Sequence, residues 1–451
     1  MKKGVIYLLF CIAILDVRAQ TGWTWTELNP MPEPVSNNAV TAAMKDGIMH
    51  VYSFMGIDST KIWSGIHFKA FRYNSQTEAW DTIPPVPDNL SRIGASASTV
   101  KNKIYIIGGY NVASNSTEIS SNRIFIYNPD SNSYSEGTNI PVPIDDHVHC
   151  VWRDSLIYII TGWSNTTNVP NVQIYNPALD SWSVGTATPN NNNYKAFGAS
   201  GDILGDTIYY FGGAASVSFP EPFPAQNYLR KGVIDPSDPT QIIWSDTILD
   251  SSLKGYRMAS TTHGNKVFWI GGSDVTYNFD GIAYNSSGGV NPLARIVTYD
   301  SESMTLVENT GSPFAVMDLR GIASIAPNKY IIAGGMDSGQ VVSNKTFLLE
   351  YILATGIDEL NDQSFQTETD PDISREKFNI YPNPVNEYLT VNYSSQLKNV
   401  RYVIYDMTGR EIAIGKISSS KNSIALNNLT KGMYMLCIED GKRFYYRKFA
   451  K

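Results

Sequence analysis

The chain has 451 residues, a formal net charge of −7, 42% hydrophobic residues and 12% aromatic residues. These values are typical of a globular, β-rich protein with more than one domain, and they exclude long disordered regions. The first 370 residues contain no cluster of Lys or Arg. We therefore expect no nucleic-acid partner, because binding a phosphate backbone needs a basic surface.

The N-terminal residues have the features of a signal peptide. Two lysines precede an apolar run of about eleven residues, and Val17-Arg18-Ala19 follows as a cleavage pattern. We expect cleavage after Ala19, so that residues 1–19 are the signal peptide. A transmembrane helix needs ~20 apolar residues, and no later segment qualifies. The sequence predicts export and no transmembrane segment after signal removal.

An internal repeat follows the signal peptide. An apolar segment that ends in small residues recurs about every 50 residues, as IMHVYSFMGID, KIYIIGGYN, LIYIITGWS, TIYYFGGAA, KVFWIGGSD and KYIIAGGMD. Further strand patterns and turns such as Asn128-Pro129 and Asn176-Pro177 follow in several copies. The apolar segments show little alternation, so we expect both strand faces to be buried between sheets stacked around an axis.

These copies resemble the kelch family, whose repeats carry Gly-Gly after an apolar strand and an aromatic residue later in each unit. The resemblance covers roughly residues 21 to 355 and implies an all-β, six-bladed kelch-type β-propeller over residues 20–355. Copies one and three depart from the pattern, with Met55-Gly56 and Thr161-Gly162 in place of Gly-Gly. The last copy lacks its final aromatic strand, and we expect residues 22–30 to supply it and close the ring.

Three arginines near the starts of copies are candidates for ligand binding: Arg92, Arg257 and Arg320. Propeller symmetry predicts that they meet at one mouth of the axial channel, where guanidinium groups could hold a carboxylate or a sulfate. The alternative is that they donate hydrogen bonds to backbone carbonyls of neighbouring blades.

Long loops after copies three, four and five supply the other candidates. Aromatic side chains in these loops could stack on sugars while carboxylates accept hydroxyl groups, or the aromatic tips could pack on one another. The candidates are Trp163, Phe219, Glu221, Phe223, Asp274, Tyr277 and Tyr284. Some kelch proteins resemble N-acetylneuraminate epimerases, in which an acidic residue and an arginine act near the channel. Glu221 and Arg257 are the nearest counterparts here, although no motif fixes them.

His147 and His149, in the segment DDHVHC, point to the same face of an expected strand and could share a metal ion. The copper radical oxidases of this fold need two His and two Tyr, one Tyr being joined to a Cys, and the remaining histidines supply no convincing partner. Aligning this copy with the previous one pairs His147 with Gly94 and His149 with Ser96. We therefore expect hydrogen-bonded positions on an inner strand or its rim, and no metal or cofactor.

The C-terminal part of the chain differs from the repeats. Residues 356–375 are polar and acidic and indicate a linker. Residues 376–451 contain short alternating strands and turns, which predict a small antiparallel β-sandwich. This region resembles the type A C-terminal sorting domain of the type IX secretion system. The matching residues are Tyr381, Pro382, Asn383, Pro384, Gly409, Gly432 and Tyr434.

The sorting resemblance implies the type IX machinery as a partner and release or attachment at the cell surface. It does not define what the propeller does there, since kelch propellers include sugar-acid isomerases, copper radical oxidases and adaptors. We expect a module that binds an extracellular glycan or protein. The alternative is an enzyme that acts on an acidic sugar, with the arginines as carboxylate ligands.

Overall fold

The computed structural model describes residues 22–217, 222–248, 252–352, 378–393, 400–406, 411–419, 421–427, 429–440 and 443–451. The predicted signal peptide and the predicted linker lie outside these ranges. The described residues are almost entirely β-structure, with two short 3-10 helices, η1 (Trp63–Gly65) and η2 (Ser338–Gln340). In this part of the chain, no helix is both long and apolar enough to cross a membrane.

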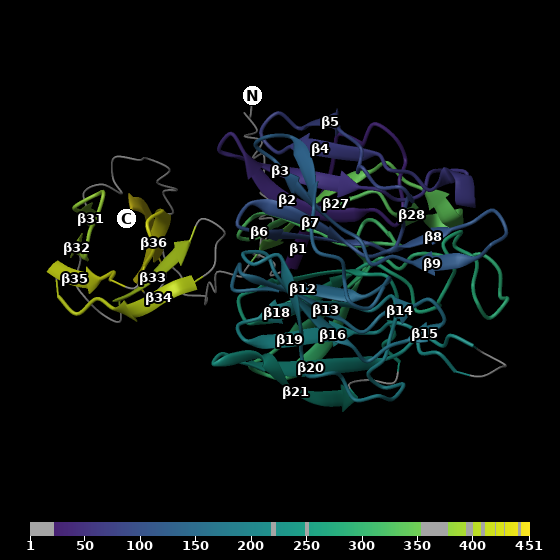
Figure 1. Cartoon of the computed structure of the whole chain (residues 1–451). Coiled ribbons are helices and arrows are strands. Elements are labelled where there is room, and N and C mark those ends of the chain that lie inside the picture. Colours follow the sequence, from purple (N-terminus) through teal and green to yellow (C-terminus); the bar gives the residue numbers. More distant parts are fainter. Residues whose placement is uncertain are drawn as a thin grey trace, which may run out of the picture. The chain divides into compact units, whose positions relative to one another are not determined.

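Six four-stranded sheets occupy the described residues between Gly22 and Ile352, and we number them in chain order (Figure 1). Sheet one contains β2 (Ala39–Lys45), β3 (Ile48–Phe54), β4 (Ala70–Asn74) and β5 (Ala79–Ile83). Sheet two contains β6 (Ser96–Val100), β7 (Lys103–Ile107), β10 (Ile124–Asn128) and β11 (Ser133–Glu136). Sheet three contains β12 (Val148–Trp152), β13 (Leu156–Ile160), β16 (Val172–Asn176) and β17 (Ser181–Val184).

The remaining three sheets repeat this order of strands. Sheet four contains β18 (Ser200–Leu204), β19 (Thr207–Phe211), β20 (Tyr228–Asp235) and β21 (Asp238–Ile248). Sheet five contains β22 (Ala259–His263), β23 (Lys266–Ile270), β24 (Arg295–Asp300) and β25 (Thr305–Thr310). Sheet six contains β26 (Ala323–Ala326), β27 (Lys329–Ala333), β30 (Thr346–Ile352) and β1 (Gly22–Leu28). The fourth strand of sheet six therefore comes from the other end of the chain, because β1 is hydrogen-bonded to β30.

Hydrogen bonds and a β-bridge join the six sheets in a closed cycle. Thr41 bonds Thr99 at 3.0 Å, Ser98 bonds His149 at 3.1 Å, and Trp152 Nε1 donates to Asp206 at 2.8 Å. Ser260 donates to Gly201 O at 2.8 Å, Tyr330 donates to Thr262 O at 3.1 Å, and a parallel bridge joins Ala39 to Arg320. These contacts link sheets one to six in order and sheet six back to sheet one, which is the arrangement of a β-propeller.

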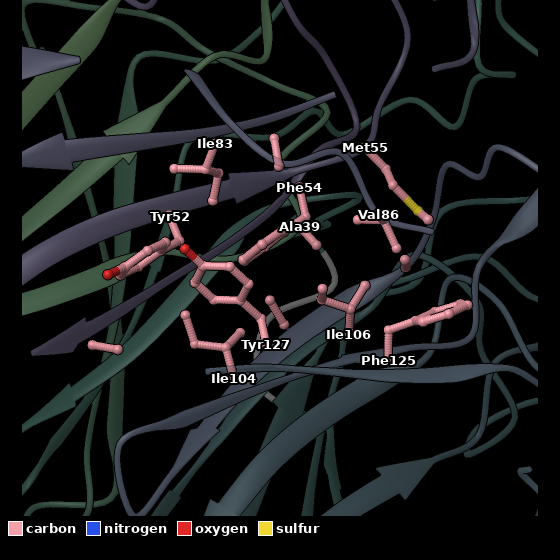
Figure 2. Packing of buried hydrophobic residues seen from close by; sticks show 14 residues of the cluster. Ala39, Tyr52, Phe54, Met55, Ile83, Val86, Ile104, Ile106, Phe125 and Tyr127 are labelled. Atoms are coloured by element: carbon pink, nitrogen blue, oxygen red, sulfur yellow. The ribbon is translucent and has the colours of Figure 1, made fainter. Parts of the chain in front are cut away.

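The second and third strands of neighbouring sheets form the apolar core. Tyr52 on β3 packs against Tyr127 on β10, with ring centroids 5.5 Å apart, and Ile104 and Ile106 of β7 lie in the same buried cluster (Figure 2). All four side chains are at most a few per cent exposed. Burial on both faces explains why these strands lack alternation in the sequence: each face contacts a different sheet.

The Gly-Gly pairs are required by backbone conformation and by close approach. Gly108 and Gly109 have φ of 62° and 91°, and a Cβ on Gly108 would lie 2.4 Å from Ile144 O in the segment before β12. Thr161 replaces the first glycine in copy three and adopts φ of 48°. Its hydroxyl donates to Val169 O at 2.9 Å and accepts a bond from Ala196 N at 3.0 Å. We infer that these bonds offset part of the strain of a β-branched residue in this conformation.

Loops between the second and third strands extend from the same ends of the sheets, and we call this side the loop face. Three of these loops form two-stranded ribbons (Figure 1). The ribbons are β8 (Tyr110–Val112) with β9 (Glu118–Ser120), β14 (Trp163–Ser164) with β15 (Thr167–Asn168), and β28 (Met336–Asp337) with β29 (Val341–Val342). The loops before the first strand of each sheet reach the same side, so the candidate site residues collect there.

The C-terminal strands form two further antiparallel sheets with one apolar cluster. One contains β31 (Phe378–Tyr381), β32 (Tyr388–Tyr393) and β35 (Lys421–Ala425). The other contains β33 (Val400–Asp406), β34 (Glu411–Lys416), β36 (Met433–Asp440) and β37 (Arg443–Ala450). Leu389 and Val391 from the first sheet share a buried cluster with Ile404 and Leu436 from the second. The fold expected for this region, a small antiparallel β-sandwich, is confirmed.

Candidate functional site

A ring of equivalent backbone positions surrounds the channel on the loop face. The ring residues are those just before the first strand of each sheet, and all have positive φ: Asn37, Gly94, Asp146, Gly198, Arg257 and Asp318. Backbone hydrogen bonds join successive members, with Asp146 N donating to Gly94 O at 3.0 Å and Gly198 N donating to Asp146 O at 2.8 Å. Arg257 N continues the pattern by donating to Gly198 O at 2.8 Å. Side chains of this ring therefore converge on the channel mouth from different sheets.

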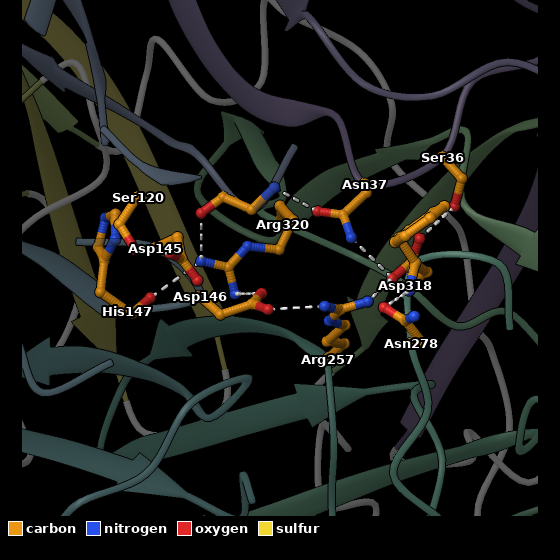
Figure 3. A network of polar contacts seen from close by, with 12 residues as sticks. Ser36, Asn37, Ser120, Asp145, Asp146, His147, Arg257, Asn278, Asp318 and Arg320 are labelled. Atoms are coloured by element: carbon orange, nitrogen blue, oxygen red, sulfur yellow. Dashed lines mark hydrogen bonds and ion pairs between the residues drawn. The ribbon is translucent and has the colours of Figure 1, made fainter. Parts of the chain in front are cut away.

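Arg257 lies between two aspartates of the ring (Figure 3). Its Nη2 is 2.6 Å from Asp146 Oδ2, and its Nη1 is 2.9 Å from Asp318 Oδ1. Asp318 also accepts hydrogen bonds from Ser36 Oγ at 2.6 Å and from Asn37 Nδ2 at 3.0 Å. Arg257 is only 1% exposed, so this guanidinium is held inside the protein by carboxylates of sheets three and six.

Arg320 also contacts Asp146, at the carboxylate oxygen that Arg257 does not use (Figure 3). Its Nη1 lies 3.4 Å from Asp146 Oδ1, and its Nη2 donates to His147 O at 3.0 Å and to Gly94 O at 3.4 Å. Arg320 is 5% exposed. It therefore uses its donors on both an internal carboxylate and backbone carbonyls.

Arg92 does not join these two arginines. Its Nε lies 2.9 Å from Asp88 Oδ2, and its Nη1 donates to Gly108 O and, at 3.3 Å, to Arg123 O. The expectation that symmetry brings three equivalent arginines together needs correction. Arg257 occupies a ring position, whereas Arg92 stands two residues before the ring residue Gly94 and Arg320 two residues after Asp318. Because of this offset, the Arg92 side chain contacts Asp88 beside sheet two, whereas Arg257 contacts the aspartates of the ring.

The aromatic loop residues pack on one another. Trp163 contacts Phe223 with ring centroids 5.7 Å apart, and Phe223 contacts Tyr284 at 4.8 Å. Tyr277 is fully buried, and its ring lies 5.1 Å from that of Tyr256. These residues belong to a cluster over the channel mouth, which favours mutual packing rather than free rings for stacking on sugars.

The other loop candidates lie in different environments. Asp274 is exposed and is not part of the polar ring. Phe219 and Glu221 lie outside the described residues, so the proposed pairing of Glu221 with Arg257 stays a prediction.

The carboxylates near the mouth are the residues of this candidate site that the sequence reasoning missed. Asp145 accepts a hydrogen bond from Ser120 Oγ at 2.5 Å, and burial, followed by the neighbouring Asp146, raises its pKa well above the ordinary value. Burial also raises the pKa values of Asp318 and Glu118. Alignment of the residues before each inner strand, in the correct register, shows Asp146 and Asp318 at equivalent places.

His147 and His149 are hydrogen-bonded residues at the interface with sheet two. His147 Nε2 lies 2.8 Å from Ser96 Oγ, and His149 Nδ1 lies 3.1 Å from Ser98 Oγ. Burial, and then the charge of Arg320, lower the pKa of His149 to about 3. The alignment of this copy was wrong by one residue, because Val148 and Ser96 hold equivalent places opposite Ile160 and Ile107. Among the described residues, no group of three or more His, Cys, Asp or Glu could hold a metal ion.

The sorting motif lies where the ends of the C-terminal domain meet. Asn383, between Pro382 and Pro384, donates to Lys448 O at 3.2 Å and accepts a bond from Ala450 N at 2.8 Å. Gly432 exchanges backbone bonds with Lys451 at 2.9 and 2.8 Å. Tyr381 is exposed, Tyr434 donates to Thr430 O at 2.9 Å, and Gly409 lies outside the described residues. These motif residues fix the last strand against the first turn and the turn before β36.

Two family models match separate parts of the chain. The Kelch motif matches residues 91–141, and the secretion system C-terminal sorting domain matches residues 379–451. The first match covers sheet two and its loops, and the second covers almost the whole C-terminal sandwich.

Curated relatives match the propeller region at low identity. Kelch-like protein terF of Aspergillus terreus is 27% identical over 36% of this chain and 35% of its own length. Beta-scruin of Limulus polyphemus is 27% identical over 35% of this chain and 17% of its own length. Human Kelch-like protein 23 is 25% identical over 57% of this chain and 40% of its own length. The chain thus spans less than half the length of these relatives.

A solved structure described as that of YjhT has the same fold. It matches with a TM-score of 0.57 and 14% identity, over 71% of this chain and 95% of the other. This identity is low enough that the match concerns the fold and not the site. Together with the two family models, it shows that the chain carries a kelch-type β-propeller and a C-terminal sorting domain, and this sorting domain indicates type IX secretion with release or attachment at the cell surface.

Proposed function

We propose that the propeller is an extracellular binding module that engages a glycan or protein partner through its loop face. The observation that carries this proposal is that the arginines of the channel mouth form ion pairs with aspartates of the same protein. Arg257 and Arg320 both pair with Asp146, Arg257 also pairs with Asp318, and all four residues are buried. A binding module needs no reactive group at this place, so a sealed mouth suits it.

The alternative enzyme would need two features that the paired residues of the mouth, Arg257, Arg320, Asp146 and Asp318, do not supply. A carboxylate substrate needs accessible guanidinium donors, but the Nη donors of Arg257 and Arg320 already bind protein carboxylates and carbonyls, and both side chains are buried. Proton transfer needs an acid or base within hydrogen-bond reach of the substrate, but Asp146 and Asp318 are almost inaccessible. A role for Glu221 remains a separate prediction.

Exposed apolar side chains on the loop face supply surface for a partner. Trp63 on η1 is 48% exposed, Val341 on β29 is 58% exposed, and Ile282 in the loop after β23 is also exposed. Apolar groups that extend from several loops of one face are typical of interaction sites. The sorting domain supports the same proposal, because export brings this face into contact with extracellular molecules.

The test compares residues on the loop face with residues in the turns at the other ends of the sheets. The chain without its predicted signal peptide, residues 20–451, is assayed on a glycan array and by capture of envelope and secreted proteins from the producing cells. A Trp63→Asp, Val341→Asp variant alters the loop face. The control is Leu179→Asp, Met304→Asp, which changes two exposed apolar residues in turns at the other ends of the sheets.

We expect the loop-face variant to lose a ligand that the wild type and the control retain. Equal loss in both variants, or no specific ligand in either assay, would contradict the proposal. Turnover of a free sugar acid by the wild type would instead establish the enzyme.

A further inference from the structure

A cavity of about 300 Å³ opens on the loop face beside sheet two. It lies between the segment that precedes β6 and the segment that joins β9 to β10. The lining residues include Asp88, Leu90, Ile119, Asn122, Arg123 and Asn139. We call it the Asn122 cavity. It is separate from the paired mouth, since none of Asp146, Arg257, Asp318 or Arg320 lines it.

We propose that the Asn122 cavity binds one neutral sugar residue of an extracellular glycan. This inference rests on the proposed binding function and specifies a ligand class for it. The proposed ligand also differs from the acidic sugar considered for the channel mouth, because the guanidinium groups of the cavity are paired with nearby carboxylates.

The charged groups of the cavity are already matched to one another. Asp88 Oδ2 lies 2.9 Å from Arg92 Nε, and Asp88 Oδ1 lies 3.9 Å from Arg123 Nε. Arg123 Nη2 lies 3.0 Å from Glu136 Oε1. Two guanidinium groups thus face two carboxylates. A charged ligand would have to compete with these ion pairs, whereas a neutral ligand would not.

The floor of the cavity is held rigidly. Arg92 is 1% exposed and donates to Gly108 O and Arg123 O, while its guanidinium lies 5.6 Å from the centre of the Phe125 ring. The Arg123 guanidinium lies 5.2 Å from the same ring. Asn89 N donates to Asp88 Oδ1 at 2.8 Å. A prepared site of this kind loses less conformational entropy on binding than a flexible loop does.

The walls offer the groups that hydroxyls require. The amides of Asn122 and Asn139 each provide donors and an acceptor, and the described structure records no hydrogen bond for either side chain. A sugar hydroxyl is likewise both a donor and an acceptor, so neighbouring hydroxyls can pair with such amides. Leu90 and Ile119 are both exposed at the cavity and can cover the C–H face of a sugar ring.

The geometry fits a sugar better than an extended peptide. The volume lies at the lower end of the range of about 300 to 1,000 Å³ that is usual for small-molecule sites. A peptide that added to β9 would need free backbone groups there, but Ser120 N donates to Asn165 Oδ1 at 3.2 Å and Ser120 Oγ accepts from Asn165 N at 2.7 Å. The end of β9 beside the cavity is therefore already bonded to the loop of sheet three.

The experiment measures binding of defined sugars to residues 20–451. The probes are glucose, galactose, mannose and N-acetylglucosamine with their disaccharides, and glucuronate and N-acetylneuraminate as acidic counterparts. Saturation-transfer NMR identifies a bound sugar, and calorimetry gives its Kd. The cavity variant is Asn122→Ala, Asn139→Ala. The control is Asn192→Ala, an exposed asparagine in the corresponding loop before β18.

We expect a neutral sugar to bind, the cavity variant to bind it about tenfold or more weakly, and the control to match the wild type. Neutral-sugar binding that survives in the cavity variant would overturn the assignment of the cavity while leaving the proposed binding function intact. Binding of acidic sugars alone would overturn the neutral class. Capture of a protein with no sugar bound would also overturn this inference and still support the proposed function, whereas absence of any ligand would overturn both.

Discussion

The channel mouth and the Asn122 cavity both contain arginines paired with aspartates. The two regions differ in how far these ion pairs are exposed to solvent. At the mouth, Arg257 bridges Asp146 and Asp318 beneath packed aromatic loops. At the cavity, Arg92 forms a buried ion pair with Asp88, whereas the Arg123 side chain is 30% exposed. The same residue types thus join sheets in one region and line an open surface in the other. Exposure and pairing, rather than the presence of arginine, distinguish a structural site from a binding site.

The largest expected effect is at the mouth. Arg257→Met should lower the free energy of unfolding by about 3 to 5 kcal/mol, because it leaves buried Asp146 and Asp318 without their shared cation. All nine tryptophans precede residue 270, so tryptophan fluorescence during urea unfolding reports on the propeller and not on the sorting domain. The double variant Arg257→Met, Asp146→Asn should be less destabilised than the sum of the single variants predicts. A loss below about 1 kcal/mol for Arg257→Met would show that the mouth does not hold the sheets together.

A smaller loss is expected at the floor of the cavity. Arg92→Met should lower the free energy of unfolding by about 2 to 3 kcal/mol, because Asp88 loses a charged partner but borders a cavity that water can enter. The same fluorescence measurement applies. A loss equal to that of Arg257→Met would remove the energetic difference between the two regions.

The pH dependence of the free energy of unfolding should distinguish the buried Asp145 at the mouth from an exposed aspartate. Burial, and then Asp146, raise the pKa of Asp145, so the folded chain keeps this proton where the unfolded chain has lost it. The contribution to stability is therefore fully present below the ordinary aspartate pKa of about 3.9 and is lost as the pH rises through the raised value. Asp145→Asn should make the free energy of unfolding fall less between about pH 4 and about pH 8. Urea titrations at several pH values check this, with the exposed Asp130→Asn as control; an unchanged pH slope in Asp145→Asn would contradict it.

The smallest effect on stability is expected for Arg123, a partly exposed residue that lines the cavity. Arg123→Gln should change the free energy of unfolding by less than about 1 kcal/mol, because its partner Glu136 is 61% exposed. Binding of a neutral sugar should nevertheless weaken, because Arg123 lines the cavity. Calorimetry beside urea unfolding tests both halves. A large loss of stability would mean that Arg123 belongs to the structural class that Arg257 represents.

Much of the fold could be predicted because its signals are local. An apolar run that ends in Gly-Gly predicts a buried strand followed by a turn with positive φ. This pattern marks the second strand of every sheet, with Met55 and Thr161 in place of the first glycine in two copies. The aromatic strand at Gly22–Leu28 likewise suits an outer position, and the structure pairs it with β30. The sorting domain was predictable because its motif residues occur in order within one short region.

The site was harder to predict, because its residues come from different sheets. Asp146, Arg257 and Asp318 are 111 and 61 residues apart, and nothing in the local sequence states that they meet. The alignment of the copies was wrong by one residue at His147, and the three arginines stand at different places relative to the ring. A small offset at a strand end changes which neighbour a side chain faces.

The sequence by itself therefore determined the repeat of buried apolar strands, the use of the N-terminal strand and the sorting domain, because turn chemistry and apolar burial act over a few residues. Only the tertiary structure decided that Arg257 and Arg320 are held by internal carboxylates while Asn122 and Asn139 face a cavity. Ion pairing and exposure depend on the positions of side chains from several sheets, and those positions exist only after the sheets have packed.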